Sequence, residues 1–180
     1  MTAEFTIKAL VGLLPVLAFL GFLLYLDSYK LLRLKTLVAV IAAGGAVALL
    51  ALGLNGALLE TTGLDFAIYT RYVAPLVEEA LKALVVVYLF RTHRIGFLVD
   101  AAILGFAVGA GFAMMENFFV LQAHGDARMV VWFVRGFGTA IMHGGVTAIF
   151  ALVSQALTER QMRINPLRYL PGLALAAVLH

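Results

Sequence analysis

The sequence predicts an all-α membrane protein: a polytopic bundle of about six transmembrane helices, with the N-terminus outside. Two observations support this fold class. The 180 residues are 63% hydrophobic and 13% charged, with a mean hydropathy of +1.02, whereas soluble domains are about half apolar and about a quarter charged. Long apolar runs also alternate with short charged clusters. A spanning helix needs about 20 mostly apolar residues, and several of these runs are long enough.

Six apolar segments follow one another along the chain. The predicted spans are Ile7–Leu26, Thr36–Leu59, Tyr72–Phe90, Gly96–Val120, Met129–Leu157 and Leu167–His180. The first has too long an apolar stretch for a signal peptide, and no small-residue cleavage site follows it. The sixth has only 14 residues, too few to span, so we expect that the chain is truncated at His180. Residues 1–180 are predicted to form a single membrane domain.

The basic residues are distributed unequally between the two sets of loops. The loops after the first, third and fifth segments contain Lys30, Arg33, Lys35, Arg91, Arg94, Arg160, Arg163 and Arg168. The opposite loops contain Arg71, Arg128, Glu60, Asp65 and Asp126. The positive-inside rule therefore places the first set of loops in the cytoplasm. The net charge of +3 is too small to suggest nucleic acid as a partner, and the absence of cysteine excludes disulfides and thiolate chemistry.

Several polar and ionisable side chains lie within the predicted spans, where such groups are rare and usually mark function. They are Glu78, Glu79, Lys82, Asp100, Glu116, Asn117, Arg135, His143, Thr147 and His180. On a helix, Lys82 can reach the carboxylate three or four residues before it. We expect it to neutralise either Glu78 or Glu79 and leave the other free to act as a general base.

Four of these groups are predicted to lie at related depths. With a rise of ~1.5 Å per residue, Glu79, His180 and His143 lie ~16, ~20 and ~21 Å from the cytoplasmic ends of their helices. Glu116 lies ~30 Å from that end of its helix. These glutamates and histidines from four helices are therefore expected to converge on a polar, water-accessible pocket in the outer half of the membrane. Arg135 is expected either to pair with Glu116 or to extend toward the membrane surface.

Glycines accompany the polar residues of the fourth and fifth segments. Small residues let membrane helices approach closely, so we expect tight packing that holds the polar groups in place. The glycines concerned are Gly105, Gly109, Gly111, Gly136, Gly138, Gly144 and Gly145.

Four motifs occur in order on successive segments. They are "EEALK" at Glu78–Lys82, "GFAMMEN" at Gly111–Asn117, "RGFGTAIMHGG" at Arg135–Gly145, and a histidine at His180. Together they resemble the PrsW family of intramembrane proteases, which is distantly similar to the CAAX prenyl endopeptidases and the Abi proteins. The resemblance covers roughly Tyr72 to His180, which we take as the catalytic helix core.

The resemblance implies hydrolysis of a peptide bond in a membrane-anchored substrate, such as an anti-sigma factor in site-1 signalling proteolysis. It also implies an integral protein of a prokaryotic cytoplasmic membrane, with the bilayer and the substrate as partners. By the same resemblance, Glu78 and Glu79 match the family's double glutamate and Glu116 its FxxxE glutamate. His143 and His180 match its two histidines, and Lys82, Asn117 and Arg135 are supporting residues.

Two mechanisms are compatible with these residues. In the first, His143, His180 and Glu116 or Glu79 bind Zn²⁺, which requires about three N/O ligands and one open position. In the second, no metal is needed: Glu79 or Glu78 activates water, and His180 helps to bind the oxyanion. We favour the second slightly, because the charge of Lys82 disfavours a nearby dication. No residue follows His180 to supply the asparagine or aspartate that the related enzymes carry.

A proton-coupled transporter or carrier is the alternative function. Buried glutamates and histidines also relay protons through membrane proteins, and the same Glu/His/Lys cluster would serve. The sequence shows no inverted repeat, which argues against a carrier.

Overall fold

The computed structural model describes residues 3–26, 33–123, 128–159 and 166–180, and this part of the chain is helical with no strand. Its α-helices are α1 (Ala3–Leu26), α2 (Leu34–Thr62), α3 (Phe66–Ile68), α4 (Ala74–Arg91), α5 (Leu98–Ala123), α6 (Met129–Thr139), α7 (Val146–Glu159) and α8 (Tyr169–Leu179). Two wider π-helical segments, Tyr69–Val73 and Ala140–Gly145, join α3 to α4 and α6 to α7. A 3₁₀ turn, Pro166–Arg168, precedes α8.

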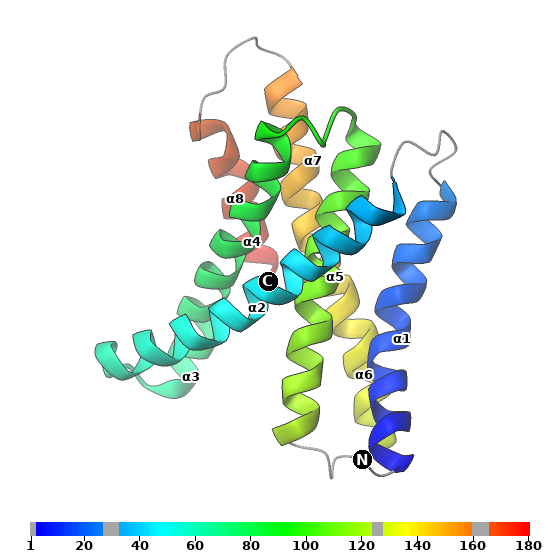
Figure 1. Ribbon diagram of the computed structural model, residues 1–180. Helices are drawn as coiled ribbons and strands as arrows, with labels where there is room; N and C mark the ends of the chain where they lie inside the picture. Colours follow the sequence, from blue (N-terminus) through cyan, green and yellow to red (C-terminus); the bar gives the residue numbers. More distant parts are fainter. Residues whose placement is uncertain (1–2, 27–32, 124–127, 160–165) are drawn as a thin grey trace.

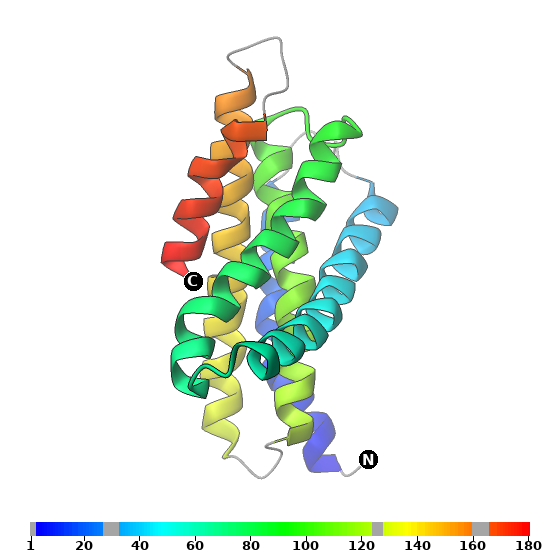
Figure 2. The ribbon, with the colours of Figure 1, turned by 90° about the vertical axis from the view of Figure 1, so that its left-hand side faces the viewer.

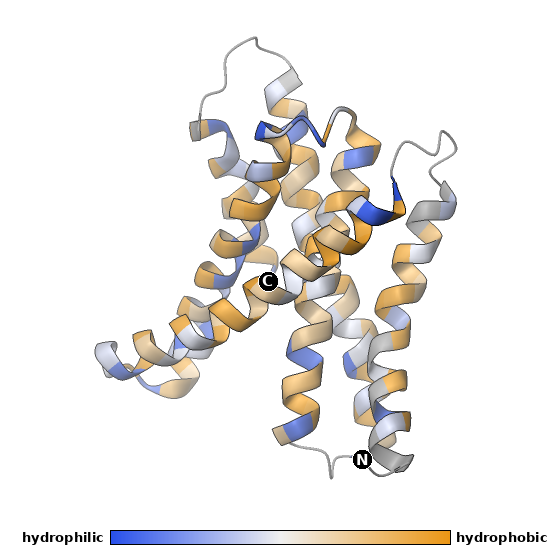
Figure 3. Ribbon diagram, viewed as in Figure 1, coloured by the Kyte–Doolittle hydropathy of each residue, from blue (hydrophilic) through white to orange (hydrophobic). Residues whose placement is uncertain are grey.

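The predicted all-α membrane bundle is confirmed, and each predicted span falls on a helix or a continuous helical run. Three helical runs are long and apolar enough to cross a membrane, namely 34–62, 98–123 and 129–158. Helix α8 and residues 6–22 of α1 form shorter apolar stretches. Figure 3 shows hydrophobic residues along most helices, with hydrophilic residues at the ends and in patches on α4 and α5.

Helix α5 lies at the centre of the bundle and is buried along most of its length (Figure 1). It packs against α2, α7 and α1, while α8 lies on α7 and α4. Figure 2 shows the start of α2, the α4–α5 connection and the start of α8 at one end of the bundle. These segments belong to the predicted basic side. Lys30, Asp126, Arg160 and Arg163 lie outside the described residues, and the assignment of this end to the cytoplasm stays a prediction.

A tight turn brings α4 back alongside α2. Gly63 ends α2 in the left-handed conformation, with φ +61°, and its N–H donates to the Leu59 carbonyl, as glycine commonly does at a helix end. Asp65 then starts the next helical run by accepting hydrogen bonds from Ala67 N and Ile68 N at 2.9 and 3.2 Å, which satisfies N–H groups that a new helix leaves free. Residues far apart in the sequence thereby face each other across α2 and α4.

Glycines permit the close helix crossings on both sides of α5. A Cβ added at Gly44 would meet the Val108 carbonyl, and one added at Gly111 would meet the Ile41 carbonyl. On the other side, a Cβ at Gly109 would meet the backbone carbonyl of His143. These contacts confirm the predicted packing role of the α5 glycines. They also place the His143 segment directly against α5.

The glycines around His143 do not all share that role. A Cβ at Gly136 would meet the backbone of α1, and one at Gly144 would meet the Phe106 ring. Gly138 and Gly145 have open space where their side chains would be, so the tight packing that we predicted at these two positions is absent. They lie on the outward side of the helical run.

Replacing Gly44 by alanine should destabilise the bundle, whereas the same change at Gly53 should not. The added methyl at position 44 clashes with backbone that cannot rotate away, and overpacking typically costs about 1–3 kcal/mol. Gly53 is on the same helix but has nothing within 4 Å of an added Cβ, so Gly53→Ala should stabilise by up to about 1 kcal/mol through helix propensity. Unfolding of both variants in detergent checks the pair; equal stability would contradict the close crossing.

Candidate active site

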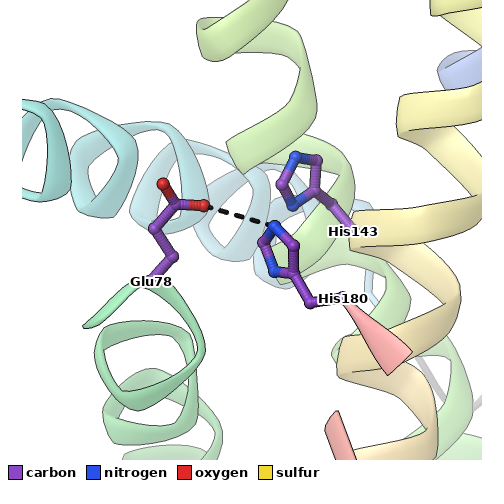
Figure 4. Close-up of side chains that lie close together, drawn as sticks. All are labelled: Glu78, His143 and His180. Atoms are coloured by element: carbon purple, nitrogen blue, oxygen red, sulfur yellow. Dashed lines mark ion pairs between the residues drawn. The ribbon is translucent and has the colours of Figure 1, made fainter. Parts of the chain in front are cut away.

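The double glutamate and Lys82 occupy successive turns of one face of α4. The helix starts with Pro75 in its first turn, where the missing N–H of proline removes no helical hydrogen bond. Opposite α4, the π-helical segment after α6 presents His143. The C-terminal end of α8 brings His180 into the same space, and Figure 4 shows Glu78, His143 and His180 pointing toward one another.

The Lys82 ammonium group is the innermost element of this cluster. Lys82 has no exposed surface, and its Nζ lies 2.6 Å from Glu79 Oε1 and 3.0 Å from His143 Nδ1. It also lies 4.5 Å from the centroid of the Phe112 ring, within the range of a cation–π contact. The ammonium group therefore has a carboxylate, an imidazole and an aromatic face around it. Of the two carboxylates predicted as its partner, Glu79 is the one that it contacts at hydrogen-bond distance.

Glu79 also orients His180. Its Oε1 lies 2.7 Å from His180 Nδ1, and because a carboxylate only accepts, Nδ1–H is the donor. That hydrogen bond leaves Nε2 of the neutral ring without a proton. His180 Nε2 lies 3.6 Å from Glu78 Oε2. A carboxylate that fixes one ring nitrogen of a histidine and directs the other is the arrangement commonly found behind metal-binding histidines.

Glu116 and Arg135 hold His143 from the opposite side. Arg135 Nη2 lies 2.6 Å from Glu116 Oε1, so the predicted pairing of this arginine with Glu116 is present. Glu116 Oε2 lies 2.5 Å from His143 Nε2. Since the Lys82 ammonium is a donor only, His143 Nδ1 accepts from it and Nε2–H donates to Glu116. The imidazole is thus neutral, with both nitrogens engaged.

Two residues that sequence reasoning missed complete the surroundings of Glu78. Asn55 Nδ2 lies 3.3 Å from Glu78 Oε1, and Tyr69 donates its hydroxyl to Asn55 Oδ1 at 3.0 Å. Tyr69 is almost completely buried. The signal for Asn55 was available, because an amide in an otherwise apolar segment is unusual inside a membrane. Asn55 precedes residue 72, so the cluster extends beyond the predicted 72–180 core.

Asn117 and Glu116 are adjacent in sequence but have different surroundings. The Asn117 amide donates to Thr139 Oγ1 at 2.8 Å and to the Gly12 carbonyl at 3.3 Å. It therefore ties α5 to α6 and α1 and does not join the carboxylate–histidine cluster. Its predicted supporting role is limited here to helix packing.

A cavity of about 240 Å³ adjoins the cluster. Glu78 and Glu116 both line it, together with Asn55 from α2. Glu79 is buried behind them, with 1% of its side chain exposed against 20% for Glu78. The structure thus brings Glu78, Glu79, Glu116, His143 and His180 together, as we expected from the sequence. It gives the two adjacent glutamates different surroundings.

The donor set also fits a metal ion such as Zn²⁺. Glu78, His143 and His180 each offer a ligand atom, and these atoms lie within 4.8 Å of one another. Two imidazoles and one carboxylate, with a fourth position open, form a common ligand set of catalytic zinc. The carboxylate in this group is Glu78, whereas the sequence-based set contained Glu116 or Glu79. Glu116 is engaged by Arg135 and His143, and Glu79 by Lys82 and His180.

Comparison with known families gives a match over most of the chain. The profile described as "PrsW family intramembrane metalloprotease" matches residues 33–180. The match begins well before Tyr72 and therefore includes α2, which carries Asn55. Neither the curated proteins nor the solved structures contain a significant match.

Removing the charge of Lys82 should destabilise the protein strongly. Lys82→Met leaves the Glu79 carboxylate buried without its ammonium partner, and breaking a buried ion pair in this way costs about 3–5 kcal/mol. The control is Lys35→Met, an exposed lysine, for which a change within about 0.5 kcal/mol is expected. Unfolding in detergent measures both.

The double variant Lys82→Met/Glu79→Gln separates charge from packing. It should be more stable than Lys82→Met alone, because neither charge then remains buried and unpaired. If Lys82→Met were no less stable than Lys35→Met, the buried pair would not be a structural requirement.

Proposed function

This chain belongs to the PrsW family of intramembrane metalloproteases, and we propose that it hydrolyses a peptide bond in a membrane-anchored protein or peptide, with the Glu78 carboxylate at the reacting water. We place it in a prokaryotic cytoplasmic membrane, as the family resemblance implies. One observation carries the assignment to Glu78. Of the three clustered glutamates, it alone has no lysine or arginine within hydrogen-bond distance in the described part of the chain, and it lines the cavity.

The three carboxylates differ in how well they can accept a proton. Glu79 lies 2.6 Å from the Lys82 ammonium and Glu116 lies 2.6 Å from the Arg135 guanidinium. A cation at that distance favours the ionised carboxylate and weakens it as a base. Glu78 instead contacts the neutral amide of Asn55 at 3.3 Å. It is therefore the best placed of the three to take a proton from water.

The surrounding residues hold this carboxylate and its water in position. Asn55 donates to one Glu78 oxygen and is itself held by Tyr69, which leaves the other oxygen toward His180. His180, oriented by Glu79, presents Nε2 to the same space. When that nitrogen carries a proton it can donate to the oxygen on which negative charge develops during hydrolysis. Lys82 and Glu79 act through the histidines and are positioning residues.

A bound metal would change the role of Glu78 but not its importance. Glu78, His143 and His180 would hold the ion, which would supply a Lewis acid for the peptide carbonyl. His143 would then exchange one of its present partners, Lys82 or Glu116, for the ion. Glu116 would remain as a carboxylate on the cavity wall.

Glu78→Gln should strongly reduce proteolysis while leaving the fold intact. The change keeps the shape and the Asn55 contact but removes the proton acceptor, so kcat should fall by about 10²–10⁴-fold. Cleavage of single-span peptides in liposomes, followed by mass spectrometry, gives the measurement, with Glu60→Gln, an exposed carboxylate on α2, as the matched control. Full activity in Glu78→Gln would contradict the assignment. Proton flux across the liposomes without any cleavage by the unmodified chain would favour a carrier instead.

Metal analysis of the purified protein decides between the two roles of Glu78. If Glu78, His143 and His180 are ligands, the detergent-solubilised chain should hold about one zinc, which is lost in Glu78→Gln and His180→Ala but kept in Glu60→Gln. If the mechanism is metal-free, the purified chain should hold no stoichiometric zinc, and chelators should not affect cleavage. Zinc that persists in both site variants would contradict this ligand set.

A further inference from the structure

The cavity beside Glu78 is lined by both polar and apolar residues. The polar ones are Asn55, Glu78 and Glu116. The remaining wall is apolar and comes from α2 and α5: Ala48, Ala51, Leu52, Phe112, Phe119 and Val120. Its volume of about 240 Å³ far exceeds the roughly 30 Å³ that one water molecule occupies in the liquid. The cavity therefore has room for a water molecule and a side chain.

We propose that this cavity is a substrate subsite that binds an uncharged, apolar side chain next to the scissile bond, and that Ala48 and Ala51 set its size limit. The inference rests on the proposed function, because it assumes that the peptide bond lies beside Glu78. A substrate backbone held there directs its neighbouring side chain along the apolar wall.

The lining selects against charged side chains. An acidic side chain would be repelled by Glu78 and Glu116, and a polar one would lose its hydration along a wall without hydrogen-bond partners. A basic side chain would be drawn to the two carboxylates and would occupy the place that the water needs. An apolar side chain gains from burial against the Phe112 and Phe119 rings.

The size limit comes from two alanines on one face of α2. Ala48 and Ala51 are three residues apart, so their methyl groups point the same way, and both are buried beside Phe112. A leucine at either position would extend into the cavity. A pocket that differs by one methylene already changes the preference between substrates by about 10–200-fold.

One lining residue of the cavity also lies on the outer surface of the bundle: Leu52 is 56% exposed. Figure 1 shows the C-terminal half of α2, with α3 and the start of α4, diverging from α5 and α6. A membrane-anchored segment can therefore approach laterally, through the bilayer, and place one side chain in the subsite.

The first experiment tests binding without requiring cleavage. The Glu78→Gln chain in liposomes is exposed to single-span peptides that carry a photoreactive diazirine analogue of leucine at successive positions. Crosslinks are expected on 48–52 of α2 and 112–120 of α5, and Ala51→Leu should weaken them about tenfold. Gly53→Leu is the matched control, because its side chain would point into open space. The absence of crosslinks in these two segments would overturn the subsite.

The second experiment tests size selection during catalysis. Single-span peptides carry Ala, Leu, Phe or Asp beside the bond that the unmodified protein cleaves, located by mass spectrometry. The unmodified chain should cleave the Leu and Phe peptides and reject Asp. Ala51→Leu should still cleave the Ala peptide, but its cleavage of the Phe peptide should fall by at least about tenfold. Gly53→Leu should leave the cleavage profile unchanged.

The outcomes separate the two proposals. If Ala51→Leu left the cleavage profile unchanged, or reduced cleavage of all peptides equally, the size limit would be overturned even though proteolysis is present. Crosslinks in the cavity that Ala51→Leu weakens, without cleavage by the unmodified chain, would support the binding site while contradicting the proposed hydrolysis.

Discussion

The buried ammonium group of Lys82 determines how the rest of the cluster is arranged. A charge without water around it must find partners within the bundle, and Lys82 finds Glu79, His143 and the Phe112 ring. A buried ion pair is weak evidence for stability, since well-packed apolar residues are often at least as stable in its place. Here the pair has a second consequence: each of the two polar partners of the ammonium group contacts a further side chain of the site. Glu79 contacts His180, and His143 contacts Glu116.

Close helix crossings make these contacts possible. Gly44 and Gly111 let α2 approach α5, and Gly109 lets the His143 segment approach it from the other side. Within a membrane, the hydrophobic effect does not drive helices together, so close packing and interhelical hydrogen bonds carry more of the association. Both are present around α5. The same crossings bring Ala48 and Ala51 next to Phe112 and so define the cavity beside the carboxylates.

The three clustered glutamates carry the same carboxylate group but have different surroundings. Lys82 satisfies Glu79, Arg135 satisfies Glu116, and the remaining carboxylate, Glu78, faces an amide and the cavity. Among the described residues, two of these carboxylates pair with a lysine or arginine and Glu78 does not. The proposed function uses this difference, because a proton acceptor must stay available while its neighbours are held in place. Asn55 and Tyr69 extend this arrangement to α2 and to the segment before α4.

The sequence alone determined the class of fold and the glutamates and histidines of the cluster. Hydropathy predicts the helices because each must match the bilayer thickness, and polar residues inside such helices are few enough to identify Glu78, Glu79, Glu116, His143 and His180. Only the tertiary structure decided how they are connected. The choice of Glu79 as the partner of Lys82, and the contact of Asn55 with Glu78, depend on helix rotation and crossing. Those are set by packing at glycines and at the Gly63–Asp65 turn, and a linear pattern of residues leaves them open.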